Sequence, residues 1–412
     1  MSDDTKPLLL VLASTYPRWR DDPEPAFVHE LSRRLLDRFR VVVVVPDAPD
    51  ADPSGMLDGV EVVRYRYAPR RLQTLVNHGG IATNLQRSPW KWLLVPGFVW
   101  GQYLAARRIL RRREVAVIHA HWLLPQGLVA RRLSRLHAVP YGVTSHGGDL
   151  FGLRGRVSTA LKRRVARSSA GMTVVSRAMR DEVARLRLHP PVVRVVPMGV
   201  DLAERFVPDP GSPRGARELL FVGRLVPKKG LRHLLDAMPA ILAEYPDVTL
   251  TIAGFGPEQP SLEAQAARLR VQDSITFAGA TPQRELPAMY RRASVFVAPF
   301  IRDESGNQEG LPVALMEAVG CGCPVVVGDV AGVRDLLGHA AGDVIVRAED
   351  TLALSSAVIA VLREPAKAMK QARELRETAA DKVGWRHIAA AYGDWLQCCR
   401  VAAPAGSAPE AE

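Results

Sequence analysis

A chain of 412 residues exceeds one typical hydrophobic core, so its length favours two or three domains, and we expect two large ones. Its composition, 47% hydrophobic and 24% charged, excludes wholesale disorder. The net charge of +12 comes from residues 1–203, which carry 32 Lys and Arg against 17 Asp and Glu, whereas the rest carries 23 against 26. This asymmetry suits an anionic membrane or a phosphate-bearing acceptor. No nucleic acid partner is expected, because nucleic-acid motifs and aromatic interleaving are missing.

The first half of the chain alternates short apolar runs with segments of helical length. Its opening run, Leu8–Ala13, predicts a buried strand rather than a signal peptide. The most apolar longer stretch, Trp90–Leu104, contains Lys91 and Pro96, so no membrane span is expected. Residues 1–203 are therefore expected to form an N-terminal Rossmann-like domain with a parallel sheet covered on both faces. The expected strands are Leu8–Leu12, Val41–Val45, Val60–Val63, Val115–Ile118, Tyr141–Thr144, Met172–Val175 and Val192–Val196.

A Pro- and Gly-rich segment, residues 204–215, interrupts this alternation and predicts an interdomain linker. The alternation then restarts, and residues 216–384 are expected to form a second doubly wound domain. A helix over residues 385–400 is expected to pack back on the N-terminal domain, and residues 401–412 are expected to form a disordered tail. The expected strands of the second domain are Leu219–Val222, Val248–Ala253, Ile275–Ala278, Val295–Ala298, Pro324–Val327 and Val344–Val346.

The predicted fold is therefore α/β, with two doubly wound Rossmann-like domains that face each other across a cleft. Ligands of open α/β sheets bind at the carboxyl ends of the strands, so the cleft is the expected active site.

No metal site is expected. The four cysteines form two close pairs, Cys321 with Cys323 and Cys398 with Cys399, which predicts reduced structural thiols and a cytoplasmic protein. The run Asp50-Ala51-Asp52 has the D-x-D spacing of metal-dependent glycosyltransferases, but no apolar strand or histidine follows to complete a site.

A cationic loop, residues 223–230, joins a predicted strand to a predicted helix in the second domain. Within it, the Arg224 guanidinium can hold two oxygens, Lys229 adds a point charge, and the helix start adds its dipole. The loop therefore suits a diphosphate. It has neither the G-x-G-x-x-G nor the Walker pattern of common nucleotide sites, and a solvated basic turn is the alternative.

A second cluster combines glycines, a proline and two glutamates eight positions apart, Glu309 and Glu317. At the rise of an α-helix, eight residues span about 12 Å. The two carboxylates of a glycosidase acid/base pair stand only roughly 5 to 9.5 Å apart, so these glutamates are not such a pair. The two carboxylates can instead accept hydroxyl hydrogen bonds from two ends of one extended ligand. Pro312 suits the first turn of a helix, so backbone amides near it are expected to form an anion site; these are the amides of Gly310, Leu311 and Val313.

Together, residues 309–324 and 223–230 resemble the donor site of the retaining glycosyltransferases of family four, which share the two-domain GT-B fold. The segments 254–257 and 198–201 extend the resemblance over nearly the whole chain. It implies that Arg224 and Lys229 bind the diphosphate, Glu309 the donor sugar and Glu317 the ribose, without a cofactor or metal ion. The residues implied to line the donor site are Gly223, Arg224, Lys229, Gly254, Glu309, Gly310, Leu311, Val313 and Glu317.

Two polar motifs follow strands in the first domain, His119-Ala120-His121-Trp122 and Ser145-His146-Gly147-Gly148-Asp149. The resemblance implies that His121 lies near the transferred sugar, and that His146 and Asp149 line the acceptor side of the cleft. For each histidine, a buried hydrogen-bonding role is the alternative. Members of the family often carry a Gly pair after the first strand, whereas Pro23–Ala26 stands here. The amides of Phe27 and Val28 are the expected substitute.

The predicted function is transfer of a sugar from a UDP- or GDP-linked donor to a glycan, lipid-linked or small-molecule acceptor, with retention and without metal. Peripheral contact with an anionic membrane is also expected. The alternatives are an epimerase or phosphorylase on the same fold, and a non-catalytic sugar-nucleotide binding protein. A nicotinamide-dependent oxidoreductase is disfavoured, because residues 14–27 contain no glycine for its fingerprint.

Overall fold

The computed structural model describes residues 5–20, 22, 26–48, 50–76, 80–211 and 213–402, and the chain divides into two compact units. The first unit comprises the chain up to Pro197 and again from Ile388, and the second comprises Met198–His387. The chain thus passes from one unit to the other twice. Among the described residues, no helix combines the length and the apolar character needed to cross a membrane.

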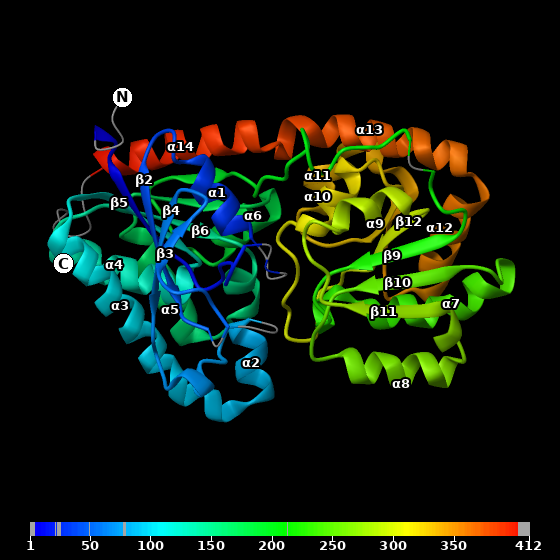
Figure 1. Cartoon of the computed structure of the whole chain (residues 1–412), viewed down its shortest axis with the longest axis horizontal. Coiled ribbons are helices and arrows are strands. Elements are labelled where there is room, and N and C mark those ends of the chain that lie inside the picture. Colours follow the sequence, from blue (N-terminus) through cyan, green and yellow to red (C-terminus); the bar gives the residue numbers. More distant parts are fainter. Residues whose placement is uncertain are drawn as a thin grey trace. The chain divides into compact units, whose positions relative to one another are not determined.

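In the described part of the first unit, eight strands form one sheet in the order β3-β4-β2-β1-β5-β6-β7-β8 (Figure 1). Neighbouring strands are parallel except β3, which pairs antiparallel with β4 at the edge. The strands are β1 (Leu8–Leu12), β2 (Arg40–Pro46), β3 (Gly55–Leu57), β4 (Val60–Tyr65), β5 (Val115–His121), β6 (Tyr141–Ser145), β7 (Gly171–Val174) and β8 (Val193–Val195).

Helices from distant parts of the sequence cover this sheet. From α14, the Trp395 ring fits against Gly142 of β6 and Gly171 of β7 and lies 5.3 Å from the ring of His119. The last helix of the chain therefore completes the core of the first unit. The α-helices of this unit are α1 (Phe27–Arg34), α2 (Ile81–Arg87), α3 (Val95–Arg112), α4 (Leu128–His137), α5 (Arg156–Arg167) and α6 (Arg177–Arg185), with α14 (Trp385–Val401) from Ile388 onward.

In the described part of the second unit, six parallel strands form a sheet in the order β11-β10-β9-β12-β13-β14. The strands are β9 (Glu218–Val222), β10 (Thr249–Ala253), β11 (Ile275–Gly279), β12 (Val295–Ala298), β13 (Val325–Gly328) and β14 (Ile345–Val346). The α-helices are α7 (Leu231–Glu244), α8 (Gln259–Leu269), α9 (Leu286–Arg292), α10 (Val313–Gly320), α11 (Val333–Leu337), α12 (Thr351–Arg363) and α13 (Pro365–Val383).

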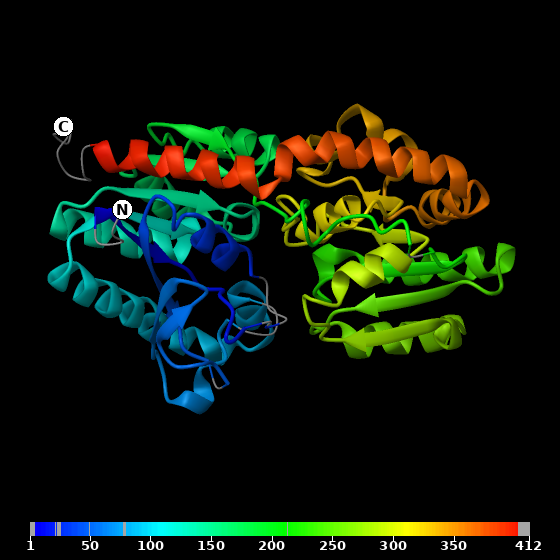
Figure 2. The same cartoon turned by 45° about the horizontal axis from the view of Figure 1, so that its top comes forward.

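Alternate residues of the second sheet enter two separate cores. In β9, Leu219 and Phe221 pack with α7, α8 and α12, whereas Leu220 and Val222 pack with α9, α10, α11 and α13. The ribbon in Figure 2 shows helices on both sides of this sheet. Because successive side chains of a strand point to opposite faces, a sheet covered on both faces needs continuous apolar strands. This accounts for the apolar runs in the sequence.

The boundary between the units lies earlier than the expected linker, residues 204–215. The Arg214 guanidinium donates hydrogen bonds to the carbonyls of Tyr290, Arg291, Ala293, Cys321 and Gly322, at 2.7 to 3.0 Å. Arg291 in turn donates to the carbonyls of Arg205 and Val207. The segment is therefore packed on the second unit, and the division falls between Pro197 and Met198. Most of the expected tail, residues 403–412, lies outside the described residues.

Candidate active site

The cationic loop follows β9 and leads through the 3₁₀ turn η6 (Pro227–Lys229) into α7. Its last residue, Gly230, has a φ of +67°, and a Cβ at this position would overlap the carbonyl oxygen of Pro299. Only glycine combines this backbone conformation with such close approach. The glycine thus holds the loop against the end of β12.

A second glycine brings the next loop against the first. Gly254 directly follows β10 with a φ of +151°, and a Cβ there would overlap the carbonyl oxygen of Gly223. The Leu225 amide also donates a hydrogen bond to the Phe255 carbonyl, at 2.9 Å. The predicted residues Gly223 and Gly254 are therefore in contact, and they position the loop that carries Arg224.

Glu309 joins the cationic loop through two ion pairs. One of its carboxylate oxygens lies 2.9 Å from the Lys228 ammonium nitrogen and 3.3 Å from that of Lys229. The Glu309 side chain is only 13% exposed, and the Lys229 nitrogen also lies 4.8 Å from the centre of the Phe300 ring. The structure thus brings together two residues predicted to act on the donor, Lys229 and Glu309.

Electrostatics fix the charge of this carboxylate. Burial alone would raise the pKa of Glu309, but the positive charges of Lys228, Lys229 and Arg224 outweigh burial and hold that pKa well below its usual range. Burial lowers the pKa of Lys229, and the Glu309 carboxylate opposes this shift. Glu309 is therefore ionised at neutral pH and can accept hydrogen bonds from hydroxyl groups.

The start of α10 lies just after Glu309 in the chain. The helix begins at Val313, with Pro312 at the preceding position. The amides of Gly310, Leu311 and Val313 come before or at the first helical residue, so they have no carbonyl partner within the helix. This is the arrangement expected of an anion site at a helix start.

Glu317 lies in a different environment from Glu309. It is only 5% exposed, and the Tyr290 hydroxyl donates a hydrogen bond to its carboxylate at 3.0 Å. Burial raises the pKa of Glu317 to about 7, although the Tyr290 hydroxyl and the Arg205 charge act in the opposite direction. Protonated and ionised forms are thus close in free energy near neutral pH.

In the first unit, three histidines meet at the ends of β5 and β6. The rings of His121 and His146 are stacked, with centroids 5.1 Å apart, and one hydrogen bond joins His121 Nδ1 to His146 Nε2 at 2.9 Å. His119 Nε2 pairs with the Thr144 hydroxyl at 2.7 Å. His121 is 1% exposed, whereas His146 is half-buried. In this conformation, His146 is the member of the stacked pair with exposed surface.

The histidines are neutral. Burial lowers the pKa of His119 and of His146 to about 3, and it lowers that of His121 well below its ordinary value. When both rings are neutral, one ring nitrogen can donate its N–H to the unprotonated nitrogen of the other ring. If both rings were protonated, their positive charges would repel each other at this distance.

Asp149 faces the interior. It is 3% exposed, and its carboxylate accepts hydrogen bonds from the Ser145 hydroxyl at 2.8 Å and from the Leu123 amide at 2.7 Å. These contacts join the chain after β5 to the chain after β6. The expected acceptor-side role of Asp149 is therefore one of positioning in this conformation, because the carboxylate has almost no exposed surface.

Phe27, the first residue of α1, lies beside the histidines. Its ring lies 4.9 Å from that of His146 and 6.1 Å from that of Trp122. The preceding residues 23–25, where the family often has glycines, lie outside the described residues. The structure thus gathers Phe27, His121 and His146, three of the predicted site residues, at one edge of the sheet.

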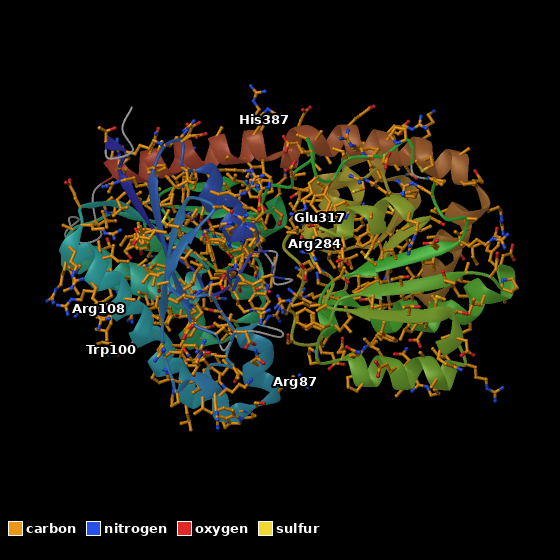
Figure 3. All side chains as sticks on the ribbon, viewed as in Figure 1. Arg87, Trp100, Arg108, Arg284, Glu317 and His387 are labelled. Carbon is orange, nitrogen blue, oxygen red and sulfur yellow. The ribbon has the colours of Figure 1, made fainter. Side chains whose placement is uncertain are left out.

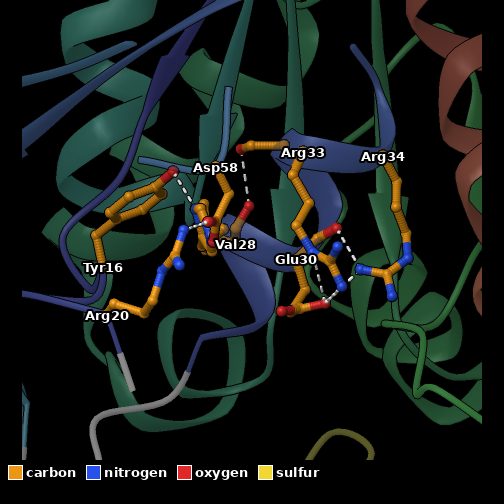
Figure 4. A network of polar contacts seen from close by, with 9 residues as sticks. Tyr16, Arg20, Val28, Glu30, Arg33, Arg34 and Asp58 are labelled. Carbon is orange, nitrogen blue, oxygen red and sulfur yellow. Dashed lines mark hydrogen bonds and ion pairs between the residues drawn. The ribbon is translucent and has the colours of Figure 1, made fainter. Parts of the chain in front are cut away.

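A chain of hydrogen bonds that runs from the buried Tyr16 to the exposed Arg20 holds α1 in place (Figure 4). The Tyr16 hydroxyl pairs with His29 Nδ1 at 2.8 Å, His29 Nε2 with Asp58 at 3.0 Å, and Arg20 with the other Asp58 oxygen at 2.5 Å. The chain ties together the loop after β1, helix α1 and the turn before β4. It was not predicted, because its members are far apart in sequence and belong to no motif.

Sequence reasoning also missed Lys228 and Tyr290. Lys228 is adjacent to the predicted Lys229, and a pair of lysines does not reveal which one faces a carboxylate. Tyr290 approaches Glu317 only because α9 packs beside α10. No local signal identifies either contact.

Models of two families match the chain. The model of group 1 glycosyl transferases matches residues 203–382, and that of Glycosyltransferase Family 4 matches residues 26–204. A glycogen synthase of Mycobacterium tuberculosis is 32% identical over 385 residues, which cover 88% of each chain. A GDP-mannose-dependent alpha-(1-6)-phosphatidylinositol monomannoside mannosyltransferase of Mycolicibacterium smegmatis is 29% identical, over 70% of this chain and 78% of the relative.

Solved structures share the fold. A sucrose-phosphate synthase from Thermosynechococcus elongatus superposes with a TM-score of 0.78 at 20% identity, covering 95% of this chain and 98% of the other. The Anabaena protein HepE in complex with UDP-glucose superposes with a TM-score of 0.71 at 15% identity, covering 94% and 99%.

Proposed function

The chain belongs to glycosyltransferase family 4 and has the GT-B fold, and on this premise we propose that it transfers a sugar from a UDP- or GDP-linked donor with retention and without a metal ion. The observation that supports this most is the cluster of Lys228, Lys229 and Arg224 around the Glu309 carboxylate. The cations suit a diphosphate, and an ionised carboxylate suits sugar hydroxyls.

In the proposed reaction, the bond between the anomeric carbon and the diphosphate oxygen breaks while the acceptor oxygen bonds to that carbon from the same face. The acceptor proton goes to the departing phosphate. Arg224, Lys229 and the amides before α10 stabilise the charge that develops on the leaving group. Because this stabilisation is already in place before reaction, it lowers the barrier without a metal ion.

Glu309 is assigned to the donor sugar, and Glu317 to the ribose. Two lysines keep Glu309 ionised and fix its position, so its free lone pairs can accept from hydroxyl groups. The stacked His121 and His146 are assigned to the sugar and acceptor side. Their neutral rings offer hydrogen bonds without adding charge.

The acceptor is proposed to be a glycan or a lipid-linked sugar. Two relatives support this class, since one is a glycogen synthase and the other is a phosphatidylinositol monomannoside mannosyltransferase. We place the reaction in the cytoplasm, with peripheral contact at the inner face of the membrane.

The test uses Glu309→Gln and Lys229→Met, with UDP-glucose and GDP-mannose offered to glycan and lipid-linked acceptors. Each variant is expected to lose roughly 100- to 1,000-fold in turnover, the usual effect of removing one preorganised charge partner. Glu304→Gln, an exposed glutamate of the same loop, is the matched control and keeps wild-type turnover. Wild-type turnover in a folded Glu309 or Lys229 variant contradicts the donor assignment.

Product analysis separates the alternatives. Proton NMR of the product is expected to show that the transferred sugar keeps the anomeric configuration it had in the donor. Excess EDTA is expected to leave the rate of transfer unchanged. Inverted product, or activity that EDTA abolishes and magnesium restores, contradicts the proposal. Conversion of the donor without acceptor identifies an epimerase, a requirement for inorganic phosphate identifies a phosphorylase, and donor binding without turnover identifies a binding protein.

A further inference from the structure

One long segment of the first unit carries positive charge alone. Residues 62–113 contain eleven Lys and Arg and no Asp or Glu. Glu61 lies at one end of this segment and pairs with Arg113 at 2.6 Å, so that guanidinium is neutralised. Among the described residues, Arg108, Arg111 and Arg112 form no salt bridge, and all three are exposed.

Helix α3 presents this charge on one side. Its buried side, which packs on the sheet, consists of Phe98, Gln102, Ala105, Ala106 and Ile109. Trp100, Arg107 and Arg111 recur at spacings of seven and four residues, so they share the opposite side of the helix. Trp100 and Arg108 both lie at the periphery of the first unit (Figure 3). The orientation of the helix therefore exposes an aromatic and basic stripe.

Large apolar side chains are exposed at the start of the same helix and in the 3₁₀ turn η3 (Pro89–Leu94) before it. Trp90 is 49% exposed, Trp92 59%, Leu93 81% and Trp100 61%. Lys91, between two of these tryptophans, donates hydrogen bonds to the Thr74 carbonyl and the Asn84 side chain, which anchor the turn. The turn is thus held in place with its tryptophans in solvent. Helix α3 itself faces the core and ends in exposed basic residues, but the three tryptophans and Leu93 lie outside its buried side.

We infer that this surface, the basic aromatic patch, docks the first unit on an anionic lipid bilayer. The patch consists of Trp90, Trp92, Leu93, Trp100, Arg108, Arg111 and Arg112. Tryptophan rings and a leucine enter the interfacial layer, where an amphipathic ring is more stable than in water, and the guanidinium groups contact the negative headgroups. Each basic residue near such a surface increases the partition coefficient roughly fivefold.

The chemistry of the patch favours a bilayer over other partners. A nucleic acid duplex would contact the charges but would leave Leu93 and the tryptophans in solvent, because its bases are already stacked. A second copy of the chain would bring its own Arg108, Arg111 and Arg112 against those of the first, which like-charge repulsion opposes. Charge complementarity therefore selects an anionic surface.

Membrane docking deepens the proposed function, since it would bring the enzyme to a lipid-linked acceptor. It does not depend on donor chemistry, however, because none of the patch residues belongs to the donor cluster. Binding to vesicles and binding of nucleotide can therefore fail independently of one another.

The test is sedimentation of the full-length protein with vesicles of phosphatidylcholine alone and with about 30% phosphatidylglycerol. Binding is expected only to the anionic vesicles. It is expected to weaken when salt rises from about 0.1 M to about 1 M, because the screening length falls from about 10 Å to about 3 Å. Brominated phosphatidylglycerol is expected to quench tryptophan fluorescence, since the exposed rings enter the interface.

Two variants separate the contributions of charge and apolar surface. R108E/R111E/R112E is expected to lower the partition coefficient by roughly a hundredfold or more. K367E/K370E/R373E makes the same change of charge on exposed positions of α13 and is expected to bind anionic vesicles far more strongly than the patch variant. W92S/W100S is expected to weaken binding and to remove most of the quenching, whereas Leu352→Ser, at an exposed apolar position of the second unit, leaves both unchanged.

Thermal stabilisation by UDP or GDP serves as the control for folding, because the donor cluster lies in the other unit. Several results would overturn the inference: equal binding to neutral and anionic vesicles, no binding to either, or undiminished binding of R108E/R111E/R112E. Self-association that W92S/W100S abolishes would assign the patch to a second copy. Preference for RNA or DNA over anionic vesicles would assign it to nucleic acid.

Discussion

Two glutamates eight residues apart in the chain reach opposite electrostatic environments. Glu309 contacts Lys228 and Lys229, which keep it ionised, whereas Glu317 is buried beside the Tyr290 hydroxyl and has a raised pKa. The sequence identified both as candidate ligand-binding residues. It could not distinguish their charge states, because these depend on neighbours supplied by η6 and α9.

The pKa of Glu317 predicts how stability changes with pH. In the unfolded chain this group ionises near its ordinary pKa of 4.5, whereas in the folded protein it stays protonated until about pH 7. Folding therefore takes up a proton between these values. This proton uptake adds about 3 kcal/mol to the free energy of unfolding at low pH. The contribution is lost as the pH rises from 4.5 through about 7.

Glu317→Gln is expected to remove this dependence, since glutamine does not titrate. Relative to the variant, the wild type should lose about 3 kcal/mol between pH 4.5 and 7 and change little above that. Urea denaturation of both proteins at several pH values measures the difference. The exposed Glu304→Gln serves as the control, and parallel pH profiles for wild type and Glu317→Gln would show that the carboxyl is not buried as described.

At the scale of elements, the strands with continuous apolar runs were the most predictable. The expected strand Leu8–Leu12 is β1, and the expected Val295–Ala298 is β12. The edge strand β3 (Gly55–Leu57) was missed, because it is short, largely exposed and paired on one side only. A strand that is buried on both faces appears in the sequence as a continuous apolar run, whereas a short exposed edge strand has no such run.

The glycine at the end of the cationic loop sets the position of that element. Gly230→Ala is expected to destabilise the protein by roughly 2 to 5 kcal/mol, since the αL conformation costs a residue with a Cβ about 1 to 2 and overpacking adds about 1 to 3. Nucleotide binding should weaken as well, because the overlap with Pro299 displaces η6. Thermal melting and UDP titration measure both effects.

Gly148→Ala is the matched control. A Cβ at this position meets nothing within 4 Å, and the variant is expected to melt within experimental error of the wild type. If Gly230→Ala melts like Gly148→Ala, the close approach of the loop to β12 is not a constraint on the fold.

At the scale of the whole molecule, the division into units does not follow the order of the chain. The first unit contains the first 197 residues and the last 25, so its core includes Tyr392 and Trp395. A helix over residues 385–400 that packs back on the first domain was predicted. Its neighbours there, β5, β6 and β7, were not predicted, since the glycines that receive Trp395 give no signal by themselves.

Trp395→Ala is expected to destabilise the first unit by about 3 to 5 kcal/mol, the usual cost of removing a fully buried tryptophan. Trp100→Ala, at a tryptophan 61% exposed, is the control and should change stability little. Hydrogen exchange can follow each unit separately. Faster exchange in β5–β7 with unchanged protection in β9–β12 is the expected result, and uniform loss of protection in both units would contradict it.

The late position of α14 also determines the order in which a nascent chain can fold. When residue 197 leaves the ribosome, the face of the first sheet at Gly142 and Gly171 still lacks Trp395, and 190 further residues must be synthesised before Ile388 appears. At about 5 to 20 residues per second, this interval lasts about 10 to 40 s. Synthesis of the second unit is complete at His387, before the last segment of the first unit has been made. The first unit therefore begins to be translated first but finishes folding last.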